Sequence, residues 1–148
     1  MKKQTAFQYL MIFSFFCIIF LCSCGGKYTR EFSPKELVSE NSMVKLSVDK
    51  VLFKKGNLRV WGTLENKTDQ SIMLSYGSFK IKVLDTVYPG ALRVPFVRVT
   101  KDFPLEPKML KKLPGPIEAL QVAPASRGSL ILDIPGGSSV SVDFPMSE

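Results

Sequence analysis

Apolar side chains recur at every second position from residue 44 onward, in short runs that turn residues interrupt. Val44, Leu46 and Val48 form the first such set, with polar residues between them. A period of two is typical of strands that bury one face. Similar runs occupy residues 51–53, 58–65, 71–76, 79–84, 92–99, 117–122, 129–134 and 138–144. Because no long helical period competes, the pattern predicts an all-β fold, and short strands with frequent turns favour an antiparallel two-sheet sandwich.

The amino-terminal residues have the layout of a secretory signal peptide. Lys2 and Lys3 provide a basic start, and residues 10–21 form a largely apolar run. This run is shorter than the ~20 residues that a membrane-spanning helix requires. The pattern therefore predicts export of the chain.

Residues 21–24, Leu-Cys-Ser-Cys, resemble a bacterial lipobox. In that motif a small residue precedes a cysteine that receives a diacylglyceryl group before the chain is cleaved on its amino side. The resemblance implies cleavage between Ser23 and Cys24, which leaves a lipidated Cys24, carrying fatty acyl chains such as palmitate, at the new amino terminus. Several acyl chains anchor a protein firmly, whereas one binds only reversibly. The alternative is a short uncleaved anchor over residues 6–22, and in both cases the domain would be tethered to a membrane and face outward.

All three cysteines lie between positions 17 and 24, so the exported domain would contain no thiol and would depend on its apolar core. We expect a cleaved signal peptide at residues 1–23, a lipidated amino terminus with a flexible tether at residues 24–42, and the sandwich at residues 43–148. Within the tether, Ser33, Pro34 and Glu36 match a capping box, which predicts a turn of helix.

The Gly-Asn pair at residues 56–57 predicts a two-residue hairpin loop of type II′. This loop would place Lys54 opposite Arg59 and Leu52 opposite Trp61, on the outward face of the hairpin. The inward face would hold Val51, Phe53, Val60, Gly62 and Leu64. An outward tryptophan beside cations suits sugar stacking or binding of an anionic polymer. Leu52, Lys54, Arg59 and Trp61 are therefore our candidate binding residues, unless another segment of the domain covers Trp61.

Residues 101–116 interrupt the strand pattern. The segment contains four prolines that argue against regular strand pairing, at positions 104, 107, 114 and 116. Leu105, Met109 and Leu113 recur every four residues with lysines between them, which predicts a turn or two of helix. Its apolar side would cover the sandwich and Trp61, or the segment would be a basic amphipathic element for a membrane or an acidic partner.

Catalytic and metal-binding patterns are weak. The chain has no histidine, which removes Ser-His-Asp and Cys-His mechanisms and the usual zinc ligands. Ser42 with Lys45 and Ser47 with Lys50 match a Ser-x-x-Lys motif, but residues three apart on a strand point to opposite faces. The polar cluster at residues 65–69 is expected to form a turn rather than a calcium loop, and its glycosylation sequon to occur by chance. We therefore predict no catalytic residues, no metal and no cofactor.

Two segments resemble bacterial Ig-like domains of secreted proteins and lipoproteins, a family that includes the immunoprotective extracellular antigen type. Residues 60–72 (VWGTLENKTDQSI) are similar to its strand-turn-strand motif, and residues 124–135 are similar to its closing strand. The resemblance implies an Ig-like sandwich, in a family usually without assigned activity, and it carries no catalytic residues to this chain. Residues 101–116 depart from the family pattern and leave the strand order there open.

These features together predict a lipoprotein of the bacterial envelope, held in the outer membrane or at the cell surface in a Gram-negative cell. We expect a non-catalytic binding or structural module rather than an enzyme. Its partners would be the membrane, through the lipid, and an envelope protein or anionic glycan, because the net charge of +7 falls only to about +5 when Lys2 and Lys3 are removed with the signal peptide. Export argues against nucleic acid. The alternatives are an assembly factor of an envelope complex and, more remotely, a Ser/Lys hydrolase; oligomeric state and ligand stay open.

Overall fold

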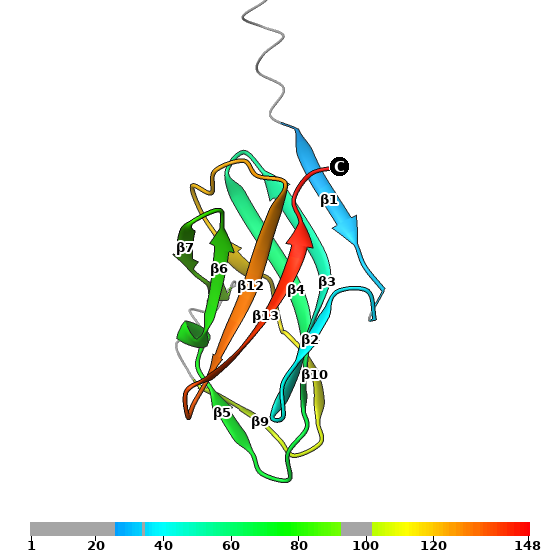
Figure 1. Ribbon diagram of the computed structural model, residues 1–148, viewed down its shortest axis with the longest axis vertical. Helices are drawn as coiled ribbons and strands as arrows, with labels where there is room; N and C mark the ends of the chain where they lie inside the picture. Colours follow the sequence, from blue (N-terminus) through cyan, green and yellow to red (C-terminus); the bar gives the residue numbers. More distant parts are fainter. Residues whose placement is uncertain (1–25, 34, 93–101) are drawn as a thin grey trace, which may run out of the picture.

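The protein is a sandwich of antiparallel β-sheets in the computed structural model, which describes residues 26–33, 35–92 and 102–148 (Figure 1). The described residues contain no α-helix apart from a short 3₁₀ turn, η1 (Tyr76–Ser78). The predicted all-β sandwich is thereby confirmed. The predicted signal peptide, Ser23, Cys24 and most of the strand expected at residues 92–99 lie outside the described residues.

The larger sheet, called the large sheet below, is built around one long hairpin. Its strands are β3 (Val44–Lys54) and β4 (Asn57–Asn66). On one side β1 (Lys27–Glu31) and β2 (Val38–Glu40) both pair with β3. On the other side β10 (Leu110–Lys112) and β11 (Ile117–Ala119) both pair with β4, and β8 (Ala91–Leu92) pairs with β11. Each edge of the central hairpin is therefore covered by two short strands in succession.

The second sheet, called the small sheet, has the order β13-β12-β6-β7. Its strands are β6 (Phe79–Val83), β7 (Thr86–Pro89), β12 (Arg127–Ile134) and β13 (Ser138–Pro145). A separate ribbon pairs β5 (Ile72–Leu74) with β9 (Phe103–Leu105). The orders β3-β4-β11-β8 and β13-β12-β6-β7 correspond to strands A-B-E-D and G-F-C-C′ of an Ig-like sandwich. The strands β1 and β2 precede this framework.

The core lies between the two sheets and follows from the alternation in the sequence. In β4, half-buried and buried residues alternate over the whole strand, and β12 and β13 follow the same pattern. Fully buried side chains include Leu46, Leu58, Leu64, Phe79, Ile81, Leu130, Leu132 and Phe144. Close packing of such apolar side chains supplies most of the stability of a domain without disulfides.

The tether expected at residues 24–42 is wrong for much of its length, because residues 27–31 and 38–40 pair with β3. Phe32 is buried, and its backbone N–H donates to the Asp49 carbonyl at 2.8 Å. The first strand of the described residues therefore begins at Lys27, inside the expected tether. The capping-box residues form a turn instead of a helix: the Ser33 N–H donates to the Glu36 carboxylate at 3.3 Å, and β2 then begins at Val38. Pro34 lies outside the described residues.

The central hairpin differs from the predicted register by one residue on each strand. Its loop consists of Lys55 and Gly56, which both have positive φ angles of 50° and 76°, as a type I′ turn requires. Asn57 belongs to β4 instead, because its side chain donates to Glu118 on β11 at 2.9 Å. Leu52 therefore faces Arg59, and Trp61 faces Lys50. Since each strand shifts by one residue, the predicted inward and outward faces are retained.

The predicted helical turn in residues 101–116 is also wrong, because the described part of this segment forms β9 and β10. Pro104 lies opposite Met73 in the edge ribbon, where its missing N–H can point away from the partner strand. Lys112 pairs with Thr63. The strand β10 thus continues the large sheet beside β4.

Candidate functional site

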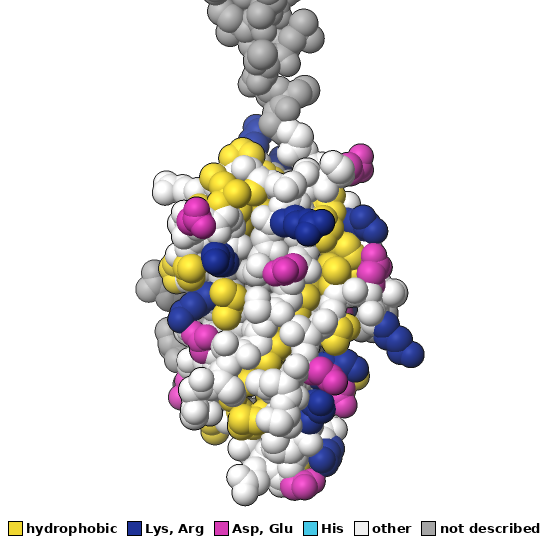
Figure 2. Space-filling model, in the orientation of Figure 1, with side chains coloured by type: hydrophobic (Ala, Val, Ile, Leu, Met, Phe, Trp, Pro, Cys, Tyr) yellow, Lys and Arg dark blue, Asp and Glu magenta, His cyan; other side chains and the backbone are white. Residues whose placement is uncertain are grey.

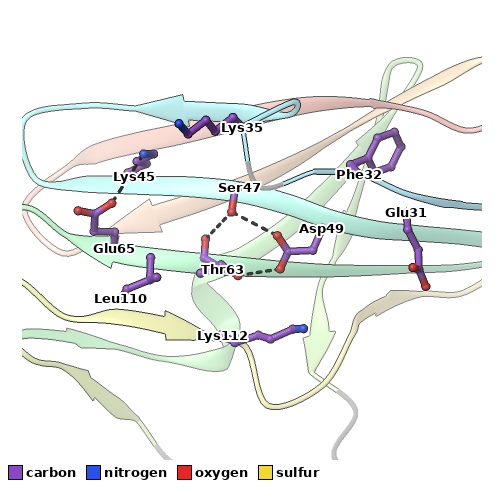
Figure 3. Close-up of a pocket in the computed structure, with 10 residues that line it drawn as sticks. All are labelled: Glu31, Phe32, Lys35, Lys45, Ser47, Asp49, Thr63, Glu65, Leu110 and Lys112. Carbon is purple, nitrogen blue, oxygen red and sulfur yellow. Dashed lines mark hydrogen bonds and ion pairs between the residues drawn. The ribbon is translucent and has the colours of Figure 1, made fainter.

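A groove of about 520 Å³ lies on the outward face of the large sheet (Figure 3). Its floor comes from β3 and β4. The loop between β1 and β2 forms one side, and β10 forms the other. The lining residues are Glu31, Phe32, Lys35, Lys45, Ser47, Asp49, Thr63, Glu65, Leu110 and Lys112.

The floor of the groove is an ordered polar network. The Thr63 hydroxyl donates to Asp49 Oδ2 at 2.7 Å, and the Ser47 hydroxyl lies 3.4 Å from Asp49 Oδ1. Ser47 itself is buried. This arrangement depends on an irregularity in the ladder between Val48 and Lys50, which leaves Asp49 without a partner on β4. A bulge of this kind re-aims a side chain, and here it turns the carboxylate toward the two hydroxyl groups.

Two cations flank this floor. Lys35 stands on the loop before β2 and Lys112 on β10, on opposite sides of the groove in Figure 3. Both side chains belong to exposed residues, and neither takes part in an ion pair between described residues. Lys45, by contrast, lies 3.8 Å from Glu65 across the ladder. The groove therefore has a lysine outside any such ion pair on either side of a floor that holds two hydroxyl groups and the Asp49 carboxylate, and Glu31 and Glu65 also line it.

The Lys50 ammonium group connects this groove to Trp61. It donates to Glu31 Oε1 at 2.7 Å and lies 5.7 Å from the centre of the Trp61 ring. The hydrogen bond and charge of Lys50, helped by the charge of Lys112, lower the pKa of Glu31 below its usual value. The half-buried indole is thus held against a cation at the border of the groove.

The structure places the four predicted binding residues on the same outward face as the groove, but in different surroundings. Leu52 is half-buried beside Arg59, and Lys54 is exposed at the end of β3. Arg59 Nε donates to the buried Glu118 at 2.9 Å. The opposed pair of cations that the predicted register implied does not form, so Arg59 has a structural partner and Trp61 is the residue nearest the groove.

The structure places the two Ser-x-x-Lys pairs in different surroundings. Ser42 is exposed in the turn before β3. Ser47 and Lys50 share the outward face, contrary to our expectation, because the ladder irregularity between them reverses the alternation. Lys50 nevertheless donates to Glu31, and the Ser47 hydroxyl is directed at Asp49 and the Thr63 carbonyl. An ammonium group bound to a carboxylate is a poor general base for a neighbouring serine.

The sequence analysis did not predict that the groove residues lie together. Lys45, Ser47, Thr63 and Glu65 are the polar half of a period-two pattern, which is what any solvent-facing strand shows. Their grouping becomes visible only with the ladder, in which Ser47 faces Thr63 and Lys112 follows on the next strand. The one available signal was the density of hydroxyl and charged side chains on two strands joined by a short loop.

Comparison of the chain with protein-family models, with curated proteins and with solved structures gave no match. Within the described ranges, no helix is long and apolar enough to cross a bilayer, and no group of three or more potential metal ligands occurs.

Proposed function

We propose that this chain is an exported lipoprotein, anchored through Cys24, whose Ig-like domain binds an anionic glycan of the cell envelope. The module acts by binding and not by catalysis. The lipobox-like residues 21–24 and the resemblance of residues 60–72 and 124–135 to Ig-like lipoprotein domains support the anchor and the class of domain. The observation that carries the ligand class is the placement of Lys35 and Lys112 on either side of an ordered polar floor.

Lys35 and Lys112, the groove lysines outside any ion pair between described residues, favour an anionic sugar chain over an uncharged ligand. Lys35 and Lys112 can each donate to a carboxylate or phosphate, and charge-assisted hydrogen bonds of this kind are the stronger ones. The hydroxyl groups of Ser47 and Thr63 suit sugar hydroxyls at the floor. Trp61 provides an amphipathic surface at the border, where a sugar ring can contact its exposed part.

A comparison of neighbouring lysines on one strand tests this proposal. Lys112 lines the groove, whereas Lys111 lies 5.3 Å from the Phe103 ring centre and does not line it. Binding of the processed chain to carboxylate- and phosphate-bearing envelope glycans would be measured for Lys112→Gln and for Lys111→Gln. Loss of one charge-assisted hydrogen bond, worth about 1.5–3 kcal/mol, predicts at least a tenfold weaker affinity for Lys112→Gln alone.

Equal affinities of the two variants and the unaltered chain would contradict the groove as the binding site. Trp61→Phe keeps an apolar ring and serves as the second probe, with a smaller expected loss. Binding of an acidic protein segment, with no binding of any glycan, would contradict the ligand class and point to an envelope protein as the partner.

A further inference from the structure

The surface at one end of the sandwich is made by turns that lie at the same end as the start of β1 (Figure 1). The loop of the central hairpin contacts residues 120–126, because the Val122 N–H donates to the Gly56 carbonyl at 2.9 Å. Lys27 shares a hollow with Pro124 and Ala125, and Leu84 shares another with Arg127. We call this surface the anchor end.

The anchor end carries most of the cations that lack a carboxylate partner. Its basic residues are Lys27, Lys54, Lys55, Lys82 and Arg127, and none of them takes part in an ion pair between described residues. Its acidic groups are fewer, with Asp85 and Glu148 at the surface and Asp143 receiving a hydrogen bond from Ser129 at 2.6 Å. The anchor end therefore has a positive field.

The opposite end of the domain differs, because it includes cations that are paired with carboxylates. Lys67 lies 3.4 Å from Glu40, and Lys108 lies 3.3 Å from Asp69. Figure 2 shows basic and acidic side chains adjoining one another at that end, and hydrophobic side chains among both kinds of charge at the anchor end. The charge of the domain is thus distributed unevenly along its long axis.

Two leucines project from the anchor end. Leu84 is 65% exposed and Leu120 is 55% exposed. Leu84 occupies a hairpin loop with a positive φ of 53°, a conformation in which glycine, asparagine or aspartate is usual. An apolar residue in a strained, solvent-facing position gains nothing for the core, and such strain is typical of functional sites.

The start of β1 at Lys27 sets the distance between this surface and the lipid. Gly25 and Gly26 lie between Cys24 and Lys27, and an extended chain covers at most about 3.6 Å per residue, or roughly 11 Å over the three steps. The Debye length at physiological ionic strength is about 8 Å. With the anchor at Cys24, the cations of the anchor end thus lie within or close to the range of the membrane's surface charge.

We propose that the anchor end docks on an anionic phospholipid surface, with Lys54, Lys55 and Arg127 at the headgroups and Leu84 and Leu120 inserted among them. This inference rests on the proposed lipid anchor. Each basic residue near an anionic membrane contributes about 1 kcal/mol. Docking would stand the sandwich upright on the membrane and hold the lining residues Lys45, Glu65 and Leu110 away from the bilayer, open to a glycan.

The experiment uses the lipidated, processed chain reconstituted into vesicles of phosphatidylglycerol with phosphatidylcholine, or of phosphatidylcholine alone. A fluorophore is attached at Leu120→Cys, and in a separate sample at Met73→Cys, which is a matched site because Met73 is 53% exposed on β5 at the opposite end. Lipids that carry a nitroxide quencher report contact with the bilayer. We expect strong quenching at position 120 in anionic vesicles and no quenching at position 73. The quenching at position 120 should be lost in the charge-reversed double variant, which combines Lys55→Glu and Arg127→Glu.

Flotation of the vesicles distinguishes a failure of the docking surface from a failure of the lipid anchor. If the protein floats with both vesicle types but position 120 is quenched no more than position 73, the docking surface is wrong and the anchor stands. If the protein does not float at all, the proposed anchor is wrong, and the docking inference that rests on it is contradicted as well. Quenching at position 120 that persists unchanged in the charge-reversed variant would also contradict the proposed role of the cations.

Discussion

Arg59 Nε lies 2.9 Å from Glu118 Oε1, across the ladder in which β4 and β11 place the two residues directly opposite each other. The Glu118 side chain is 3% exposed, and the Asn57 amide donates to the same oxygen at 2.9 Å. A carboxylate at this depth requires such donors, because an uncompensated buried charge is strongly destabilising. The pair therefore fixes the register of β11 on the hairpin.

Arg59→Ala is expected to lower the free energy of unfolding by about 1.5–3 kcal/mol, the usual cost of losing a hydrogen bond to a charged group. Lys54→Ala is the control, since Lys54 is exposed on the same face and surface changes usually stay within about 0.5 kcal/mol. Urea denaturation of both variants measures the difference. Equal stability would show that Glu118 does not depend on Arg59, and any effect of Arg59→Ala on ligand binding has to be corrected for this loss.

Asn66 is fully buried where β4 ends, and its side chain joins two separate segments. Its Nδ2 donates to the Leu105 and Gln70 carbonyls at 2.8 Å, while its Oδ1 accepts the Thr68 N–H at 2.9 Å. Asn66→Ala leaves buried backbone groups without partners, which predicts a loss of about 1–3 kcal/mol in the free energy of unfolding. Thr68→Ala keeps the bond to Leu105 and should cost less. The same loss in both variants would contradict a special role for the asparagine amide.

Gly62 permits the close approach of β3 and β4 at the ladder irregularity. A Cβ atom at this position would lie 2.6 Å from the Ser47 carbonyl oxygen, whereas at Gly77 the nearest atom would be 3.7 Å away. Gly62→Ala should therefore destabilise the domain by about 1–3 kcal/mol through overpacking, with Gly77→Ala as the neutral control. Thermal unfolding of the two variants measures the effect. An unaltered midpoint for Gly62→Ala would mean that the hairpin relaxes without cost.

The sequence predicted the strands and their faces because both depend on local alternation. In the central hairpin, Val51, Val60 and Leu64 are fully buried as expected, although the loop lies one residue earlier than predicted. The position of the loop depends on groups distant in the chain, since Glu118 holds Asn57 in β4 and Val122 binds Gly56. The predicted loop was wrong because a turn preference reflects only neighbouring residues, whereas these contacts come from residues far along the chain.

Short and polar strands were harder to predict. The strand β1 has one half-buried residue among exposed ones, so its pattern is that of a tether, and it is ordered only because the edge of β3 offers backbone groups. Pro104 argued against a strand, but an edge ribbon tolerates proline. The groove was missed for the same reason: its walls come from segments whose pairing the sequence pattern does not reveal.

The ion pair of Glu31 and Lys50 predicts a dependence on pH. Lys50, with help from Lys112, lowers the pKa of Glu31 below its usual value of 4.5. A group with a lowered pKa contributes stability above its unfolded-state pKa and loses that contribution as the pH falls through the folded value. The contact should therefore be complete at neutral pH and disappear under acid conditions, below about pH 4.5.

Titration of the Glu31 carboxyl carbon by NMR measures this directly. In Lys50→Met the midpoint should rise toward the usual glutamate value, because both the hydrogen bond and the nearest positive charge are removed. Lys35→Met, at the other side of the groove, should leave it in place. A midpoint that does not move in Lys50→Met would mean that Lys50 does not pair with Glu31 in solution. Lys50 would then be free to leave its place 5.7 Å from the centre of the Trp61 ring, because the hydrogen bond to Glu31 is the interaction that holds its ammonium group beside the groove.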